Sequence, residues 1–191
     1  MKSFFWFNYI INILKKYLKK IIILGGFIRI ELENLEKLNF VLNFLKKHSK
    51  TKFNLLVDIA CVDFLNFKDS RFLMNYLLLS CSHNSRLTVS CWLNEKDIIQ
   101  SSTNIFSGAN WLEREVWDMY GIFFYNHSDL RRILTDYGFS GYPFRKDFPL
   151  NGFFEIRYDE NKQYLVYEPI ELTQTFRFYD FLNPFHKKYI F

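Results

Sequence analysis

The chain has 191 residues, with 25 lysines and arginines against 20 aspartates and glutamates, and a formal net charge of +5. A chain of this length can bury a sizeable core and is typical of one domain with appendages. The charge excess corresponds to five N-terminal lysines, Lys2, Lys15, Lys16, Lys19 and Lys20. Since the remaining chain is neutral, the composition argues against a nucleic-acid surface there.

The cysteines predict neither a disulfide framework nor a cysteine metal site. Cys61, Cys81 and Cys91 are odd in number, lie in apolar runs and form no Cys-x-x-Cys motif. We therefore expect buried free thiols in a reducing compartment.

The residue usage is biased. Phe, Ile, Asn and Lys, which have AT-rich codons, are abundant, and this is typical of an organelle-encoded or otherwise AT-rich gene.

The first predicted element is an amphipathic helix over residues 4–23, with an apolar face of Phe7, Ile10, Leu14, Leu18 and Ile21. Its longest uncharged run is too short to span a membrane. It lacks a small-residue cleavage site and the arginines of a transit peptide. We interpret residues 1–35 as a lineage-specific docking segment, with a membrane-surface helix as the second interpretation. A strand at Ile21–Ile30 is an alternative.

Residues 36–137 are predicted to form an α+β domain. A helix at Glu33–Lys47 repeats leucines at helical spacing, with acids early and lysines late. Three strand-like runs follow, at Phe53–Asp63, Phe72–Ser80 and Leu87–Leu93. Because the links between them are short and polar, we expect an antiparallel sheet with helices packed on one face.

Residues 110–120 are the next predicted helix, with one apolar stripe formed by Leu112, Val116 and Met119. Asn110 is the predicted N-cap and Gly121 the predicted stop. Arg114 and Asp118 are one helical turn apart and would form an ion pair on the solvated face.

Residues 113–134 mix charged side chains with large apolar ones. Such a mixture is typical of a polar but buried protein–protein contact, in which charges have to be paired. We expect Arg131 and Arg132 to pair with Glu113, Glu115, Asp118 or a partner's carboxylates. The full set of predicted interface and ion-pair residues is Glu113, Arg114, Glu115, Asp118, His127, Asp129, Arg131, Arg132, Arg145 and Asp147.

The composition changes after about residue 137, because all four prolines and many aromatic residues lie there. Proline interrupts helices and sheets, whereas so many aromatic residues argue against disorder. Residues 138–191 are therefore predicted to be an extended irregular arm laid over a partner. Its expected anchors are Phe144, Phe148, Phe153 and Phe176.

Other function classes find little support. The chain has no glycine-rich nucleotide loop, and its histidines are scattered without metal-ligand spacing. Glu113, Glu115 and Asp118 could serve as an acid/base pair or as ligands of a hard metal, but the arginines nearby favour ion pairing. Arg131-Arg132 among aromatics could contact single-stranded nucleic acid, yet the local charge is nearly balanced. A standalone enzyme would need a ligand site that the sequence does not reveal.

Residues 113–134 also resemble a known family signature. Glu113-Arg114-Glu115, Asp118, Met119-Tyr120, His127 and Arg131-Arg132-Ile133-Leu134 fill every place in the signature of the thirty-kilodalton subunit family of respiratory complex I, called NADH dehydrogenase subunit nine where organelles encode it. The resemblance covers roughly residues 40–183. It includes Arg145-Lys146-Asp147-Phe148-Pro149-Leu150 and Glu168-Pro169-Ile170-Glu171. Ser128 and Tyr142 depart from the usual Pro and His.

The resemblance implies a core subunit in the peripheral arm of NADH:ubiquinone oxidoreductase, on the matrix side of the mitochondrial inner membrane. It would have no catalytic, cofactor-binding or metal residues of its own. FMN, iron–sulfur clusters, ubiquinone, electron transfer and proton translocation would belong to the complex. The implied partner is the forty-nine-kilodalton subunit, with no nucleic acid and no transmembrane span. The homologous subunit of a plastid NDH complex or of a membrane-bound hydrogenase is an alternative.

Overall fold

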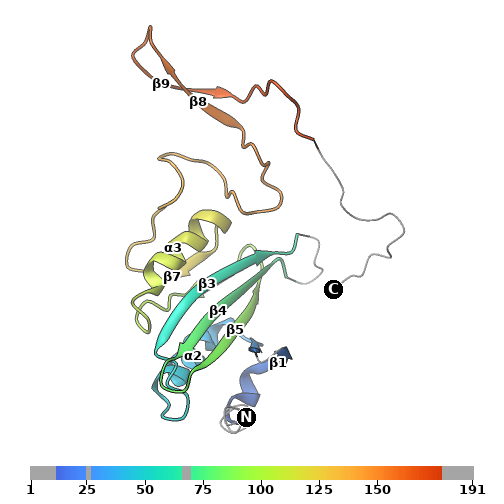
Figure 1. Ribbon diagram of the computed structural model, residues 1–191, viewed down its shortest axis with the longest axis vertical. Helices are drawn as coiled ribbons and strands as arrows, with labels where there is room; N and C mark the ends of the chain where they lie inside the picture. The colour runs from blue at the N-terminus through green and yellow to red at the C-terminus, as the bar shows by residue number, and fades with distance from the viewer. Residues whose placement is uncertain (1–11, 25–26, 66–69, 178–191) are drawn as a thin grey trace, which may run out of the picture. The chain divides into compact units, whose positions relative to one another are not determined.

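The computed structural model describes residues 12–24, 27–65 and 70–177. The chain divides into two compact units, Met1–Pro149 and Leu150–Phe191. The first unit contains a five-stranded sheet in the order β1-β2-β5-β4-β3 (Figure 1). Its strands are β1 (Leu18–Leu24), β2 (Phe27–Leu32), β3 (Leu55–Asp63), β4 (Phe72–Ser80) and β5 (Ser85–Leu93).

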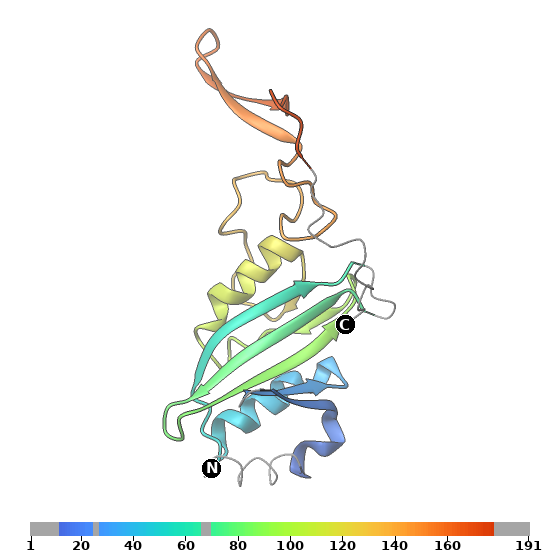
Figure 2. The same cartoon turned by 45° about the vertical axis from the view of Figure 1, so that its right-hand side comes forward.

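Two helices pack on this sheet. The short 3₁₀ turn η2 (Leu35–Lys37) leads into α2 (Leu38–Lys47), and α3 (Ala109–Tyr120) lies alongside β3 (Figure 2). Their apolar sides join one core with every second residue of β4 and β5. The cross-strand pairs Phe72↔Leu93, Met74↔Cys91, Tyr76↔Val89 and Leu78↔Leu87 are all buried. The predicted α+β class, with a mainly antiparallel sheet, is confirmed.

One strand pair differs from the antiparallel pattern. β2 and β5 run parallel, with Ile28 opposite Leu87 and Ile30 opposite Val89. Parallel neighbours need a long crossover. Here α2 and the β3–β4 hairpin occupy the connection between them.

The N-terminal segment is mostly strand where the sequence predicts helix. Residues 18–24 and 27–32 pair as the antiparallel strands β1 and β2, after a 3₁₀ turn η1 at Lys15–Tyr17. The alternative strand at Ile21–Ile30 is therefore the better prediction. The isoleucine run fits both periods, and β-branched residues pack well on a sheet. The predicted helical residues 4–11 lie outside the described residues, as do Gly25 and Gly26.

The ends of α3 correct one prediction and confirm another. Asn110 is not the N-cap, because Gly108 occupies that position and the Asn110 side chain donates to Ser128 Oγ. Gly121 does end the helix, with a φ of 78° in the left-handed region. Two short parallel strands, β6 (Ile98–Gln100) and β7 (Phe123–Tyr125), flank α3 in the chain and were not predicted.

The C-terminal region is irregular, as predicted, with one regular element. Strands β8 (Phe154–Asp159) and β9 (Tyr164–Pro169) form an antiparallel hairpin in the second unit. Proline is missing between Pro149 and Pro169, so this stretch can pair with itself. Residues 138–149, which the composition assigns to the arm, lie instead in the first unit.

The three cysteines are unpaired, in line with the sequence. Cys61 and Cys91 are buried, whereas Cys81 is exposed, in contrast to the expected burial. Cys81 follows β4 directly in the turn to β5, and turns lie on the surface.

Candidate docking surface

Glu113 joins α3 to the loop that follows β6. Its buried carboxylate accepts hydrogen bonds from the Ser101 and Ser102 hydroxyls, at 2.6 Å each, and from the Ser102 backbone N–H at 2.7 Å. His127 Nε2 lies 3.9 Å from the same carboxylate. The partners of Glu113 are thus two serines and a histidine, and not the arginines that the sequence suggests. Neutral donors compensate a buried carboxylate well when they converge on it.

Asp118 organises the segment after β7. Its Oδ1 lies 3.0 Å from Arg132 Nη1 and accepts the Thr135 hydroxyl at 2.6 Å. Its Oδ2 accepts three backbone N–H groups, those of Ile133, Leu134 and Thr135. Burial alone would raise the pKa of Asp118, but these hydrogen bonds outweigh burial and lower the pKa below its ordinary value. The structure therefore brings Arg132 to one of its expected acids.

Three other predicted charges behave differently. Arg131 pairs with Asp129 at 3.0 Å, but the Arg131 side chain is 72% exposed, so the pair is a surface pair and not a buried one. Arg114 does not pair with Asp118; its Nε donates to the Arg131 carbonyl at 3.1 Å. Glu115 is half-buried beside β3.

Arg71, which has no special place in the sequence pattern, fastens residues 145–147 to the edge of the sheet. Its guanidinium donates to both oxygens of Asp63 at 2.9 Å, to Asp147 at 2.8 Å and to Glu95. Asp63 also accepts the Lys146 backbone N–H at 2.9 Å. Burial acts to raise the pKa of Asp63, yet the Arg71 and Lys146 hydrogen bonds lower it overall. The hydrogen bond from Arg71 also lowers the pKa of Asp147.

The end of α3 is covered by the same returning segment. Arg145 Nε donates to the Tyr120 carbonyl at 2.6 Å, and its guanidinium lies 4.5 Å from the Tyr142 ring centroid. A Cβ built on Gly121 would lie 2.6 Å from the Tyr142 ring. Glycine is therefore needed here for close approach as well as for its backbone angle.

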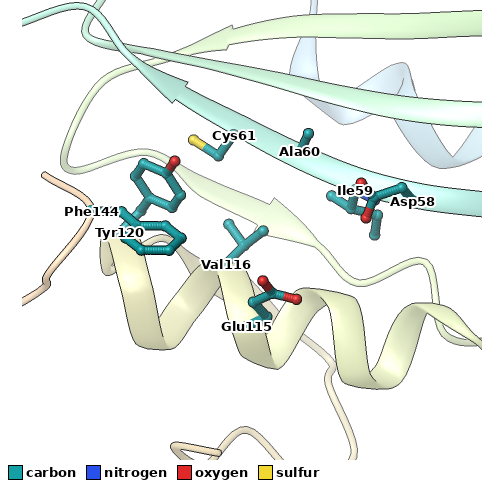
Figure 3. Close-up of a pocket in the computed structure, with 8 residues that line it drawn as sticks. All are labelled: Asp58, Ile59, Ala60, Cys61, Glu115, Val116, Tyr120 and Phe144. Carbon is teal, nitrogen blue, oxygen red and sulfur yellow. The ribbon is translucent and has the colours of Figure 1, made fainter. Parts of the chain in front are cut away.

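A small cleft lies between β3 and α3, and Figure 3 shows the residues that line it. Its volume is about 160 Å³. Asp58 and Glu115 are its acidic side chains, and Cys61 and Tyr120 are its other titratable groups. Burial, reinforced by Asp63, raises the pKa of Cys61 to about 12, so this thiol stays protonated at neutral pH. Burial likewise raises the pKa of Tyr120 to about 12.

A larger groove, of about 520 Å³, lies between α3 and residues 131–138. Arg114, Arg131 and Arg132 line it together with Trp111 and Tyr137. Both aromatic side chains are exposed, at 67% and 97%. The groove thus combines arginine with aromatic residues, the types that are enriched in protein interfaces.

The four predicted anchors fall into two groups. Phe148 is half-buried and packs against Phe139, so it contributes to its own unit. Phe144 contacts Tyr120 edge-on but remains 54% exposed. Phe153 and Phe176, in the second unit, are also exposed.

The β8–β9 hairpin has one apolar and one charged face. Side chains alternate along each strand, and the register places Ile156 opposite Tyr167 and Tyr158 opposite Leu165. All members of this apolar face are exposed: Phe154, Ile156, Tyr158, Leu165 and Tyr167. The other face is mainly charged: it carries Glu155, Asp159 and the Arg157–Glu168 ion pair, at 2.7 Å, beside Val166 and Tyr164. An amphipathic hairpin with an open apolar face is suited to covering a partner.

Several residues of these networks carry no strong sequence signal. Ser101, Ser102 and Thr135 are small polar residues in loops, and the carboxylates that accept their hydrogen bonds lie on α3, 11 to 17 residues away in the chain. Asp63 ends one predicted strand and Arg71 directly precedes the next, which would allow the two side chains to pair but does not specify it. Within the described ranges, His, Cys, Asp and Glu form no group that could hold a metal ion. None of the described helices is long and apolar enough to cross a membrane.

Similar proteins share most of this chain. Residues 33–154 match the family described as "Respiratory-chain NADH dehydrogenase, 30 Kd subunit". NADH-ubiquinone oxidoreductase subunit 9 of Dictyostelium discoideum is 46% identical over 85% of this chain and 79% of its own length. NADH dehydrogenase (ubiquinone) iron-sulfur protein 3 of Beta trigyna is 50% identical, over 81% and 80%. A subunit of the NADH-quinone oxidoreductase of Rhodospirillum rubrum is 53% identical, over 75% and 67%.

A solved structure shares the fold. A chain of the membrane-bound sulfane sulfur reductase, an archaeal respiratory membrane complex, superposes with a TM-score of 0.63 at 22% identity. The match covers 76% of this chain and 86% of that one. The family match spans more than half of the chain and includes α3 with its buried Glu113 and Asp118. The chain belongs to the family of the 30 kDa subunit of respiratory-chain NADH dehydrogenase.

Proposed function

We propose that the chain is a structural subunit of the peripheral arm of NADH:ubiquinone oxidoreductase and that it docks on the forty-nine-kilodalton subunit. Its relatives support membership of such a complex, because they are named as parts of NADH-ubiquinone or NADH-quinone oxidoreductases. In this proposal the chain has no catalytic residues of its own. FMN, iron–sulfur clusters and ubiquinone are bound elsewhere in the complex, where electron transfer and proton translocation take place.

The exposed apolar face of the β8–β9 hairpin is the observation that carries the docking role. An isolated two-stranded hairpin is marginally stable in water and needs a further layer to bury its apolar side. Here the large side chains of that face are all at least 49% exposed. A partner surface would supply the missing layer and bury the aromatic residue types that dominate interface energetics.

We further propose that the complex lies in the mitochondrial inner membrane, with this subunit on the matrix side and its gene in the organelle. The AT-rich residue usage and the similarity to subunit 9 of Dictyostelium discoideum support this. A relative also occurs in the bacterium Rhodospirillum rubrum, where it is named as a subunit of NADH-quinone oxidoreductase, so the proposed location rests on the first two observations. No observation on the described residues favours a plastid or hydrogenase subunit, or a standalone enzyme.

The test compares two lysine substitutions on neighbouring hairpin positions. Ile156→Lys places a charge on the apolar face, whereas Glu155→Lys places the same side chain on the charged face, opposite Glu168. Interface hot spots cost about 2 kcal/mol or more when lost, or roughly 30-fold in affinity. We expect Ile156→Lys to deplete the assembled complex in a native gel and Glu155→Lys to leave it near the wild-type amount.

Mass spectrometry of the co-migrating band should identify the forty-nine-kilodalton subunit. If both lysine variants assemble as well as wild type, the apolar face does not dock and the proposal fails. If the wild-type chain migrates without any oxidoreductase subunit, the proposed membership of the complex fails.

A further inference from the structure

We propose that the groove between α3 and residues 131–138 binds an acidic side chain of a neighbouring subunit, and that this carboxylate pairs with Arg114. The inference rests on the proposed function, because it requires the chain to stand in an assembly. It specifies a second contact, in the first unit, that is independent of the hairpin.

The charge of Arg114 is uncompensated among the described residues. Arg132 has Asp118 as its partner and also donates to the Gly141 carbonyl at 3.1 Å. Arg131 has Asp129. Arg114 forms no ion pair with any described residue, and its one hydrogen bond there goes from Nε to the Arg131 carbonyl. The three arginines of the groove are therefore not equivalent.

Burial makes the missing partner of Arg114 costly. The residue is only 7% exposed, and it lines the groove. Its guanidinium contacts the Trp111 ring at 5.5 Å from the centroid. A cation–π contact recovers a small part of the lost hydration, whereas a buried cation usually needs a carboxylate with matching hydrogen bonds. The terminal nitrogens of Arg114 can donate in the fork geometry that fits a carboxylate.

The surroundings favour a single carboxylate on a protein partner over a phosphate group. Asp136 lines the groove, and Asp118 and Asp129 already neutralise Arg132 and Arg131. Arg114 is then the one groove arginine without an acidic partner among the described residues, and its single charge, beside the acidic Asp136, suits one carboxylate better than a doubly charged ligand. Trp111 and Tyr137 stand exposed beside the groove, and exposed aromatic residues around a buried charge are typical of protein interfaces. An Asp or Glu flanked by apolar residues fits this chemistry.

A photo-crosslink tests the occupant in the assembled complex. A benzophenone amino acid at Tyr137 reports what covers the groove, and the same group at exposed Arg86, on β5, is the control position. We expect the position-137 probe to capture a segment of another subunit that contains Asp or Glu. Capture of a segment without an acid, of residues 178–191 of the same chain, of lipid, or of nothing would overturn the proposal. The Arg86 control should give a different product or none.

A charge exchange tests the pairing itself. Arg114→Glu should lower the amount of assembled complex about tenfold or more, because it faces the partner's carboxylate with a like charge. Changing the captured partner acid to Arg should restore assembly of Arg114→Glu. No rescue, or wild-type assembly of Arg114→Glu, would overturn the pairing. The Ile156→Lys experiment is separate, so the groove can fail while the hairpin docking stands.

Discussion

At the scale of single residues, Asp118 holds the segment after β7 in place. Five hydrogen-bond donors converge on its carboxylate: the Arg132 guanidinium, the Thr135 hydroxyl and three backbone N–H groups. Removing this acceptor would leave a guanidinium and several backbone donors without a partner. The loss is larger than for an exposed pair such as Arg131–Asp129, where water replaces the partner.

We predict that Asp118→Ala lowers the free energy of unfolding by ~3–5 kcal/mol, because it strands the partly buried Arg132. Arg132→Ala should cost less, since Asp118 keeps its other donors, but should still deplete the assembled complex. Asp129→Ala is the matched control, with an expected change below ~1 kcal/mol. Urea unfolding of the purified chain measures all three. Equal effects of Asp118→Ala and Asp129→Ala would show that Asp118 is solvated.

Acid should reduce the contribution of Asp118. Its pKa is lowered in the folded chain, so its stabilisation is complete above the unfolded pKa of about 3.9 and is lost as the pH falls through the folded value. The stability difference between wild type and Asp118→Asn should therefore narrow below about pH 4. A difference that stays constant from about pH 7 to about pH 3 would contradict the lowered pKa.

Substitutions at Gly121 and Gly138 can distinguish the cost of backbone strain from the cost of a steric clash. Both have a positive φ, at 78° and 71°, but only at Gly121 would a Cβ meet another residue. We predict that Gly138→Ala costs about 1 kcal/mol and that Gly121→Ala costs clearly more, because Tyr142 and Arg145 have to move. Thermal unfolding of the two variants checks this order, and a reversed order would contradict the packing described here.

At the scale of elements, the sequence predicts the strands β3, β4 and β5 and the helix α3 well, whereas α2 ends as predicted at Lys47 but begins at Leu38, five residues after the predicted start at Glu33. β4 begins and ends at the predicted residues, and α3 begins one residue before the predicted start. These elements have one clear hydrophobic period, which decides between helix and strand. The N-terminal isoleucine run fits both periods, so its strand pairing with β2 depends on tertiary contacts.

The candidate surface is less predictable than the fold. The opposite charges in the signature predict an acidic partner for Arg132, and the structure shows that Asp118 is the one among the candidates. The serine partners of Glu113 do not, because neutral donors leave no charge pattern. The boundary between the two units, after Pro149, is also hard to predict from the sequence, because it depends on long-range contacts. Lys146 and Asp147 form hydrogen bonds with Asp63 and Arg71, about 80 residues earlier in the chain.

Truncation after Pro149 tests this division. We predict that residues 1–149 fold, because the ion pairs of Arg71 and the contact of Arg145 with Tyr120 stay intact. We also predict that this shortened chain does not enter the complex. Truncation after Tyr137 is the comparison. It removes Asp147, one of the three acidic partners of Arg71, and the Lys146 backbone N–H that Asp63 accepts, and it uncovers Tyr120, so it should be less stable. Circular dichroism and native gels provide the two measurements. Assembly of the 1–149 chain would contradict the docking role of the hairpin.

At the scale of the whole molecule, the chain combines a core unit with a second unit that exposes its apolar face. The free protein should therefore be poorly soluble or readily cut by proteases after residue 149.

We also predict that the purified, folded chain carries no stoichiometric flavin or iron–sulfur absorbance. An ultraviolet–visible spectrum checks this, and a stoichiometric chromophore would contradict the proposed non-catalytic role.

The docking role is tested most directly by the structure of the assembled complex around the β8–β9 hairpin. We expect the face formed by Phe154, Ile156, Tyr158, Leu165 and Tyr167 to be covered by another subunit, in the main the forty-nine-kilodalton subunit. The Arg157–Glu168 face should remain hydrated. A structure in which the apolar face packs on the chain's own sheet, or stays in water, would contradict the docking role.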